Sequence, residues 1–123
     1  MPLEVANSRH PVAATADRLI AALEDRGITV FARIDHAGGA RAAGLELPDE
    51  ELLVFGDPSA GTPLMQDDPQ AGYELPLRVL VWQAGGDTLV GYRPPAELAE
   101  RYAVAERDEL LARMRKLLER LVA

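Results

Sequence analysis

The sequence predicts an α+β fold in which helices pack on one face of a mostly antiparallel β-sheet. Residues 75–84 (LPLRVLVWQA) and 88–92 (TLVGY) form two strand-like runs joined by Gly85-Gly86-Asp87, as in a β-hairpin. Amphipathic helical patterns lie towards both ends of the chain, at about 15–26 and 106–122. The element order that results, β-α-β-(α)-β-(α)-β-β-α-α, has its hairpin late in the chain, which favours the α+β class.

The first part of the chain predicts a strand, a helix and a second strand. Residues 3–8 alternate loosely and are expected to form the first strand. A helix should begin with Thr15 as its N-cap and end at Arg26, because Gly27 follows in the position where a left-handed residue is usual. Residues 28–35 (ITVFARID) alternate strictly, which predicts a strand with one fully apolar face.

The middle of the chain alternates short helices with strands. The alanine-rich segment after Asp35 is expected to form a short helix that stops at Gly44. Residues 51–55 (ELLVF) predict a strand, and a short helix is expected over about 62–68. Residues 79–82 are apolar at every position, so both faces of that strand are expected to be covered.

The C-terminal part is predicted to be helical. Proline fits the first turn of a helix, so Pro94 and Pro95 are expected to open one. The amphipathic helix at about 106–122 carries a wide leucine-rich stripe, which favours packing against the core, with pairing against a second copy in a dimer as the alternative. We expect one domain over residues 1–123, with its core at about 3–102 and the amphipathic helix at about 106–122.

Composition excludes several classes of function. The net charge is −7 and the pI about 4.8, which argues against nucleic acid and anionic membrane as partners. The absence of cysteine excludes disulfides, thiolate catalysis and cysteine-ligated metals. The N-terminus lacks the apolar core of a signal peptide and no apolar run is long enough to span a bilayer, so we expect a soluble cytoplasmic protein.

One loop has the glycine spacing of a phosphate-binding motif. Gly56 and Gly61 fit G-x-x-x-x-G after a strand, but Thr62 and Pro63 replace the lysine and hydroxyl residue that hold nucleotide phosphates and Mg²⁺. We therefore expect a strand-to-helix turn in which Gly61 supplies an unusual backbone angle. The alternative is that the Gly61-Thr62 end holds a small anion at a helix start.

Other candidate chemistry is sparse. His36 lies beside Asp35 at the end of a strand and could act as a general acid or base, although neighbouring strand residues point to opposite faces. Ser59 lacks the G-x-S-x-G context of a serine nucleophile, and the two histidines lack metal-ligand spacing, so no metal site or catalytic residue is assigned. Arg78 lies within an apolar strand, where it either snorkels or pairs with a carboxylate such as Glu74.

In combination, three motifs resemble the bacterial and archaeal domain-of-unknown-function family numbered 302. They are ARIDH (32–36), ELLVFGDPSAGTPLM (51–65) and LPLRVLVW (75–82). The family's usual F-G-N-P stands here as FGDP (55–58) and its usual L-P-L-K as LPLR (75–78). The resemblance implies a compact α+β domain of outline β-α-β-β-β-β-α, often dimeric, with no established activity. The C-terminal helix is less characteristic of it.

The positions that match the family pattern give a candidate ligand site. We expect a single cleft lined by Asp35, His36, Asp57, Gly61, Thr62, Met65 and Arg78. The leading hypothesis is a small-molecule or anion-binding accessory module that acts as a homodimer, and no cofactor is indicated. The alternative is a small enzyme that uses His36 as general acid or base with Thr62 or Ser59 nearby.

Overall fold

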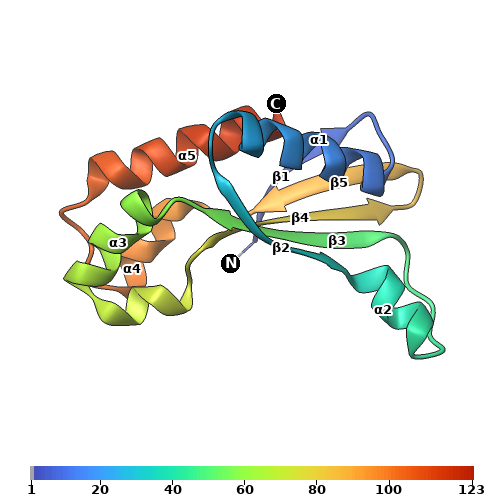
Figure 1. The fold of residues 1–123 in the computed structure, drawn as a ribbon, viewed down its shortest axis with the longest axis horizontal. Helices are drawn as coiled ribbons and strands as arrows, with labels where there is room; N and C mark the ends of the chain where they lie inside the picture. Colours follow the sequence, from blue (N-terminus) through green and yellow to red (C-terminus); the bar gives the residue numbers. More distant parts are fainter. Residues whose placement is uncertain (1) are drawn as a thin grey trace.

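The computed structural model describes residues 2–123 as a five-stranded antiparallel sheet with helices packed against it, which confirms the predicted α+β class (Figure 1). The strands are β1 (Glu4–Ser8), β2 (Thr29–Asp35), β3 (Glu50–Gly56), β4 (Leu77–Ala84) and β5 (Asp87–Tyr92). Their order across the sheet is β1-β5-β4-β3-β2, and each neighbouring pair is antiparallel. The predicted hairpin is the β4–β5 pair.

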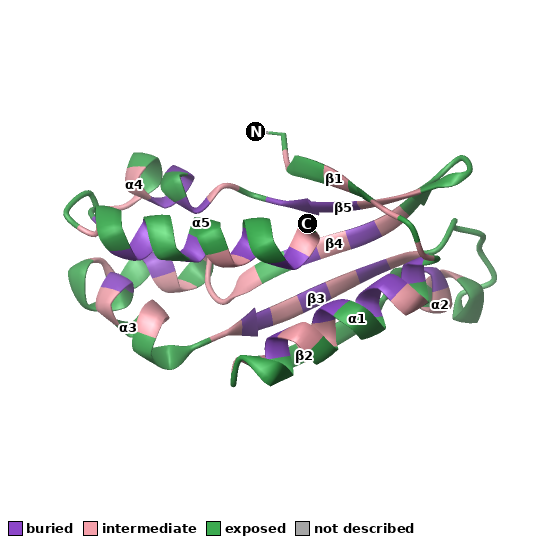
Figure 2. Cartoon of the chain, turned by 90° about the horizontal axis from the view of Figure 1, so that it is seen from above, coloured by how far each residue is buried: buried purple, intermediate pink, exposed green. Residues whose placement is uncertain are grey.

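The helices are α1 (Val12–Asp25), α2 (His36–Ala42), α3 (Pro58–Asp67), α4 (Leu98–Arg101) and α5 (Asp108–Val122), with two short 3₁₀ segments, η1 (Pro69–Tyr73) and η2 (Pro95–Glu97). Helices α1 and α5 lie over the same face of the sheet (Figures 1 and 2). Helix α2 extends from one end of the sheet, whereas α3 and α4 lie at the other end. The main hydrophobic cluster forms between the sheet and the two long helices. Its buried members are Val12, Ala16, Leu19, Leu23, Leu53, Phe55, Val79, Val81, Val90, Tyr92, Leu118 and Leu121.

Helix α5 packs against the sheet and contributes to both hydrophobic clusters. Leu118 and Leu121 are members of the main cluster. Leu110, Leu111 and Met114 belong to a second cluster, which α5 forms with α3, α4 and the segments beside them. The leucine-rich stripe is thus used within the chain, which agrees with the core interpretation of the stripe rather than with a dimer seam.

The prediction of one fully apolar face on β2 was wrong, because the strand contains a β-bulge. Val30 pairs with Phe55 and Ala32 pairs with Val54, so Phe31 is the extra residue between them. One extra residue reverses the face to which the following side chains point. Val30 packs against the main cluster, whereas Ile34 is 41% exposed on the opposite face.

Two helices begin earlier than expected. Pro11 rather than Thr15 precedes α1, and the Thr15 hydroxyl donates to the His10 carbonyl inside the first turn. Helix α3 begins at Pro58, where the Asp57 carboxylate accepts from the Ser59 N–H at 2.9 Å. Gly61 therefore lies within α3 and has no positive φ, which contradicts the unusual backbone angle expected for it. Asp57 is the N-cap of α3 and Pro58 is its first residue. This Asp-Pro pair is a typical helix start rather than the turn expected from the sequence.

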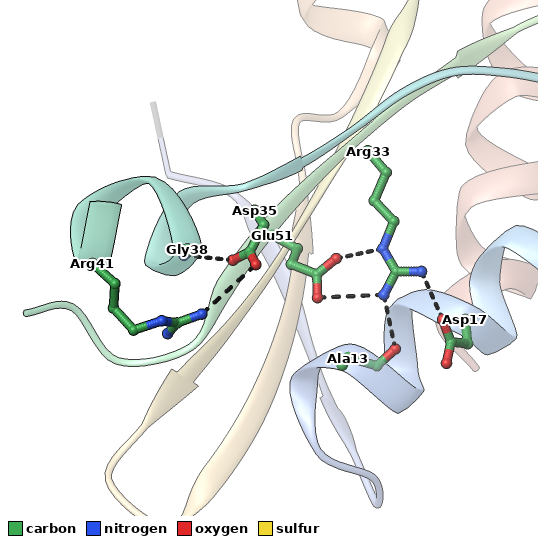
Figure 3. A network of polar contacts seen from close by, with 7 residues as sticks. All are labelled: Ala13, Asp17, Arg33, Asp35, Gly38, Arg41 and Glu51. Atoms are coloured by element: carbon green, nitrogen blue, oxygen red, sulfur yellow. Dashed lines mark hydrogen bonds and ion pairs between the residues drawn. The ribbon is translucent and has the colours of Figure 1, made fainter. Parts of the chain in front are cut away.

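A polar network joins α1 to the two neighbouring strands β2 and β3 (Figure 3). The Arg33 guanidinium donates to Glu51 Oε1 at 2.5 Å, to Asp17 Oδ1 at 2.6 Å and to the Ala13 carbonyl at 3.2 Å. These hydrogen bonds, above all that to Glu51, raise the pKa of Arg33 above its usual range. Glu51 is 7% exposed, so Arg33 neutralises a carboxylate that would otherwise be buried alone.

The second face of the sheet is not covered by helices α1 and α5. We call it the open face. The strand register places these apolar side chains on it: Val5, Ala32, Ile34, Leu52, Val54, Leu80, Trp82 and Leu89. The expectation that β4 is covered on both faces therefore fails for the single chain. Val79 and Val81 are buried beneath the helices, but Leu80 and Trp82 are only partly buried.

Candidate functional site

A cavity of about 270 Å³ runs from the open face of the sheet to the segment η2–α4. We call it the arginine cavity, after Arg78, Arg93 and Arg101 in its lining. The other residues that line it are Leu3, His36, Leu52, Glu74, Leu77, Leu80, Gly91, Tyr92, Pro94, Pro95, Glu97, Leu98 and Leu118. Its wall is thus largely apolar and its polar groups are mostly ionisable, which is the usual character of a small-molecule site.

Strand β4, the turn after β5 and helix α4 position the arginines. Arg78 lies on β4 and pairs in register with Val54, so its side chain leaves from the open face. Arg93 follows β5 directly. Pro95 then begins the 3₁₀ turn η2, which runs into α4 and ends at Arg101. The chain thereby folds back beside the start of β4, and the three arginine residues come to line one cavity.

Glu74 partly balances the arginines. Its carboxylate accepts from Arg101 Nη1 at 2.8 Å and lies 3.8 Å from Arg78 Nη2. Of the two alternatives for Arg78, the structure shows the pairing with Glu74, and the Arg78 side chain is half-exposed. Arg93 is exposed and forms no ion pair within residues 2–123. The cavity therefore holds one arginine whose charge is not matched by a neighbour.

Glu97 is the least expected group in the lining. The residue is 7% exposed, and neither carboxylate oxygen has a hydrogen-bond partner among the described residues. Buried carboxylates are ordinarily paired or hydrogen-bonded, because leaving one alone costs several kcal/mol, on the order of 1–3 even for a neutral group. Burial also raises the pKa of the hydroxyl of Tyr92, another residue of the lining.

A second cavity, of about 230 Å³, lies between α3, α5 and the ends of β2 and β3, and we call it the apolar cavity. It is lined by Ile28, Phe31, Gly56, Asp57, Pro58, Ala60, Gly61, Thr62, Met65, Leu75, Pro76, Leu77, Met114 and Leu117. No arginine, lysine or histidine belongs to this lining. Asp57 is the one charged residue in it, and the Ser59 N–H holds the pKa of that carboxyl below its usual range. These features argue against an anion at the Gly61-Thr62 end.

The structure separates the seven residues expected to line a single cleft. Asp57, Gly61, Thr62 and Met65 line the apolar cavity. His36 and Arg78 line the arginine cavity. Asp35 lines neither of these two cavities, because its carboxylate caps α2 by accepting from the Gly38 N–H at 2.8 Å. The single-cleft prediction was therefore wrong.

The geometry does not favour His36 as a general acid or base. Its side chain makes no hydrogen bond within the described part of the chain, and the neighbouring Asp35 is engaged by Gly38. Thr62 lines the other cavity, and Ser59 lies on the same helix as Thr62. Over residues 2–123, no group of three or more histidine, aspartate or glutamate side chains could hold a metal ion.

The sequence reasoning missed Arg93, Glu97 and Arg101. Each follows a strand or lies on a short turn, where no periodic pattern reports which way a side chain points. One signal was available: Glu97 and Arg101 are four residues apart and Arg93 and Glu97 are too, a spacing at which helical neighbours pair. That signal would have suggested ion pairs, which the structure does not contain.

Comparison with known proteins gives relatives of greater length. The chain is 45% identical over 103 residues to "Fluoride-specific ion channel FluC 1" of Brucella suis and to the protein of the same name in Brucella abortus. The match covers 83% of this chain but only 41% and 38% of those proteins, so the chain spans about two fifths of their length. Within residues 2–123 the structure contains no helix with the length and apolar character needed to cross a bilayer.

A solved structure shares the whole fold. The crystal structure of an uncharacterized conserved DUF302 protein from Bacillus stearothermophilus superposes with a TM-score of 0.82, over 99% of this chain and 96% of that one, at 21% sequence identity. The model of the family described as "Domain of unknown function DUF302" matches residues 4–121. The resemblance noted in the three motifs is thus confirmed over almost the full length. The chain belongs to the DUF302 family.

Proposed function

We propose that this chain is an accessory domain that binds a small anionic molecule in the arginine cavity and acts as a homodimer. The observation that carries the ligand proposal is the convergence of Arg78, Arg93 and Arg101 on one cavity of about 270 Å³ in a chain of net charge −7. Guanidinium groups bind carboxylate and phosphate oxygens through paired hydrogen bonds. Since Arg93 has no ion pair within residues 2–123, an incoming anion need not displace a carboxylate from it.

The accessory role has support from the relatives. The chain corresponds to less than half of proteins named fluoride-specific ion channels, as a domain does when it is joined to a second functional unit. The anion favoured here is an organic one, because a monatomic ion would fill only a small part of the cavity. The leucine side chains in the lining, such as Leu52, Leu80 and Leu98, would contact the apolar part of an organic ligand.

Substitution of Arg93 tests the site. Arg93→Gln is expected to weaken binding of 4-methylpentanoate by about tenfold, the equivalent of roughly one charge-assisted hydrogen bond. Isothermal titration calorimetry measures the affinity, with sodium fluoride as the comparison anion. Arg113→Gln is the matched control, because Arg113 is also exposed and forms no ion pair with the described residues, but it lies on α5 outside the cavity. The proposal would be contradicted if both variants lost the same affinity for 4-methylpentanoate, or if Arg93→Gln bound it as tightly as the wild type.

The homodimer proposal rests on the open face. Eight apolar side chains on five neighbouring strands form a continuous surface there, and two of them, Val5 and Ile34, are 52% and 41% exposed. Contiguous exposed apolar surface of this kind is typical of association sites. A flat sheet face can pack against a copy of itself about a two-fold axis. Such a dimer would cover the part of the arginine cavity near Leu52 and Leu80, so ligand binding and association would share a surface.

A charge placed on the open face tests this association. Ile34→Lys is expected to convert the dimer to a monomer, because a desolvated unpaired ammonium at an interface costs several kcal/mol, on the order of a hundredfold or more in the dissociation constant. Light scattering coupled to size-exclusion chromatography gives the mass. Leu45→Lys is the matched control, since Leu45 is 66% exposed but lies after α2, outside the open face. A wild-type protein that is monomeric at micromolar concentration would contradict the proposal.

A further inference from the structure

We infer that the ligand of the arginine cavity is a zwitterion of the α-amino-acid type, whose ammonium group binds Glu97 while its carboxylate binds the arginines. This inference rests on the proposed function and narrows it from any small organic anion to one that also carries a donor-bearing cation. It starts from Glu97, a side chain that the anion proposal does not use.

The protein itself does not satisfy Glu97. Both of its oxygens are buried and without a hydrogen-bond partner among the described residues, although the residue lines a cavity that contains three arginines. Arg101, four residues later in the chain, bonds Glu74 instead, at 2.8 Å. Arg78 also lies nearest to Glu74, and Arg93 forms no ion pair within residues 2–123. Among the described residues, no arginine of the cavity therefore forms an ion pair with this carboxylate.

A ligand ammonium fits this carboxylate better than other groups do. A carboxylate only accepts hydrogen bonds, and an ammonium offers three donors together with the opposite charge. An anion alone would leave Glu97 unpaired and would be repelled by it. A cation alone would leave Arg93 unpaired and would be repelled by the arginines. A molecule that carries both charges offers a partner to Glu97 and to Arg93 at once.

The charges and the apolar surface agree with a neutral zwitterion. The lining has three arginines against two glutamates, so it is close to balanced before a ligand binds. A ligand of zero net charge keeps that balance, whereas a dianion or a dication would not. The leucine side chains of the lining provide contacts for an aliphatic or aromatic side chain. L-Leucine is accordingly a suitable first probe.

Three probes that differ by one charged group test the inference. L-Leucine carries both groups, 4-methylpentanoate lacks the ammonium, and 3-methylbutylamine lacks the carboxylate. We expect calorimetry on the wild-type protein to give at least a tenfold higher affinity for leucine than for either analogue. Glu97→Gln should lower the leucine affinity about tenfold and leave the affinity for 4-methylpentanoate unchanged or higher. Glu100→Gln, an exposed neighbour outside the cavity, is the matched control.

A second readout is the unfolding temperature, which can be measured first without a ligand. Removal of a buried unpaired charge stabilises a protein, so ligand-free Glu97→Gln is expected to unfold at a higher temperature than the wild type. Leucine should raise the unfolding temperature of the wild type more than that of the variant.

The outcomes separate this inference from the proposed function. In one outcome, 4-methylpentanoate binds as tightly as leucine, and the affinity for both falls in Arg93→Gln but not in Glu97→Gln. The anion site is then supported and the zwitterion inference is wrong. If none of the three probes binds, both fail. If Glu97→Gln changes the oligomeric state and leaves the leucine affinity intact, Glu97 serves association and the inference is overturned.

Discussion

A chain that ends at Tyr102 is expected not to fold. The truncation removes Leu110, Leu111, Met114, Leu118 and Leu121, all of which are buried. Shortening one buried leucine to alanine costs about 2–5 kcal/mol. The net stability of a domain is about 5–15 kcal/mol, so loss of five such side chains exceeds what the remaining structure can supply. Circular dichroism and amide proton dispersion in NMR spectra would show an unfolded chain.

A milder change tests the same contact within the full-length protein. Leu118 is 1% exposed, and Leu118→Ala should lower the free energy of unfolding by about 2–5 kcal/mol in a denaturant titration. Leu117→Ala on the same helix is the matched control. Leu117 is only partly buried, so this substitution should lower the free energy of unfolding by less. A truncated chain that stays folded would show that α5 is an appendage, and equal losses in the two alanine variants would contradict the packing of α5 described above.

Arg33→Met is expected to destabilise the domain by about 2–4 kcal/mol, the range for breaking a largely buried ion pair with some allowance for exposure. The Arg33 side chain is 35% exposed, but that of Glu51 is 9% exposed and would be left without its partner. The variant would also release Asp17 and the Ala13 carbonyl on α1, so the helix would lose its polar attachment to β2 (Figure 3). Urea titration measures the change.

Two further variants define the cause of that loss. Arg33→Met combined with Glu51→Leu should recover most of the stability, because an apolar pair can replace a buried ion pair at little cost. Arg115→Met is the matched control. It breaks the Arg115–Glu119 pair, whose side chains are 59% and 54% exposed, and should cost at most about 0.5 kcal/mol. If Arg33→Met lowered the free energy of unfolding no more than Arg115→Met does, the network around Arg33 would not contribute to stability.

Local patterns were enough to predict most elements of this fold. The hairpin at Gly85-Gly86 and the helix stops at Gly27 and Gly44 depend on a few neighbouring residues, and the positive φ of Gly27 and Gly44 agrees with the role expected of them. The bulge at Phe31 could not be predicted in this way. It depends on the pairing of β2 with β3, and the strict alternation of residues 28–34 indicated an unbroken strand.

The candidate site was less accessible from the sequence than the fold. Family-like positions such as His36 and Thr62 were expected to share a cleft because both follow strands, but β2 and β3 are antiparallel and so end at opposite ends of the sheet. The three arginines of the arginine cavity come instead from β4, from the turn after β5 and from α4. Their proximity results from the path of the chain through η2, which periodicity does not encode.

The bulge at Phe31 also divides the apolar side chains in and next to β2 into two sets. Ile28 and Val30, before it, pack on the buried cluster, so changes there alter folding. Ala32 and Ile34, after it, lie on the open face, so changes there alter what that face contacts. Within one short strand, substitutions after the bulge therefore change the chemistry of the open face without changing the buried cluster. An extra residue in this strand thus lets the open face vary while the fold stays the same.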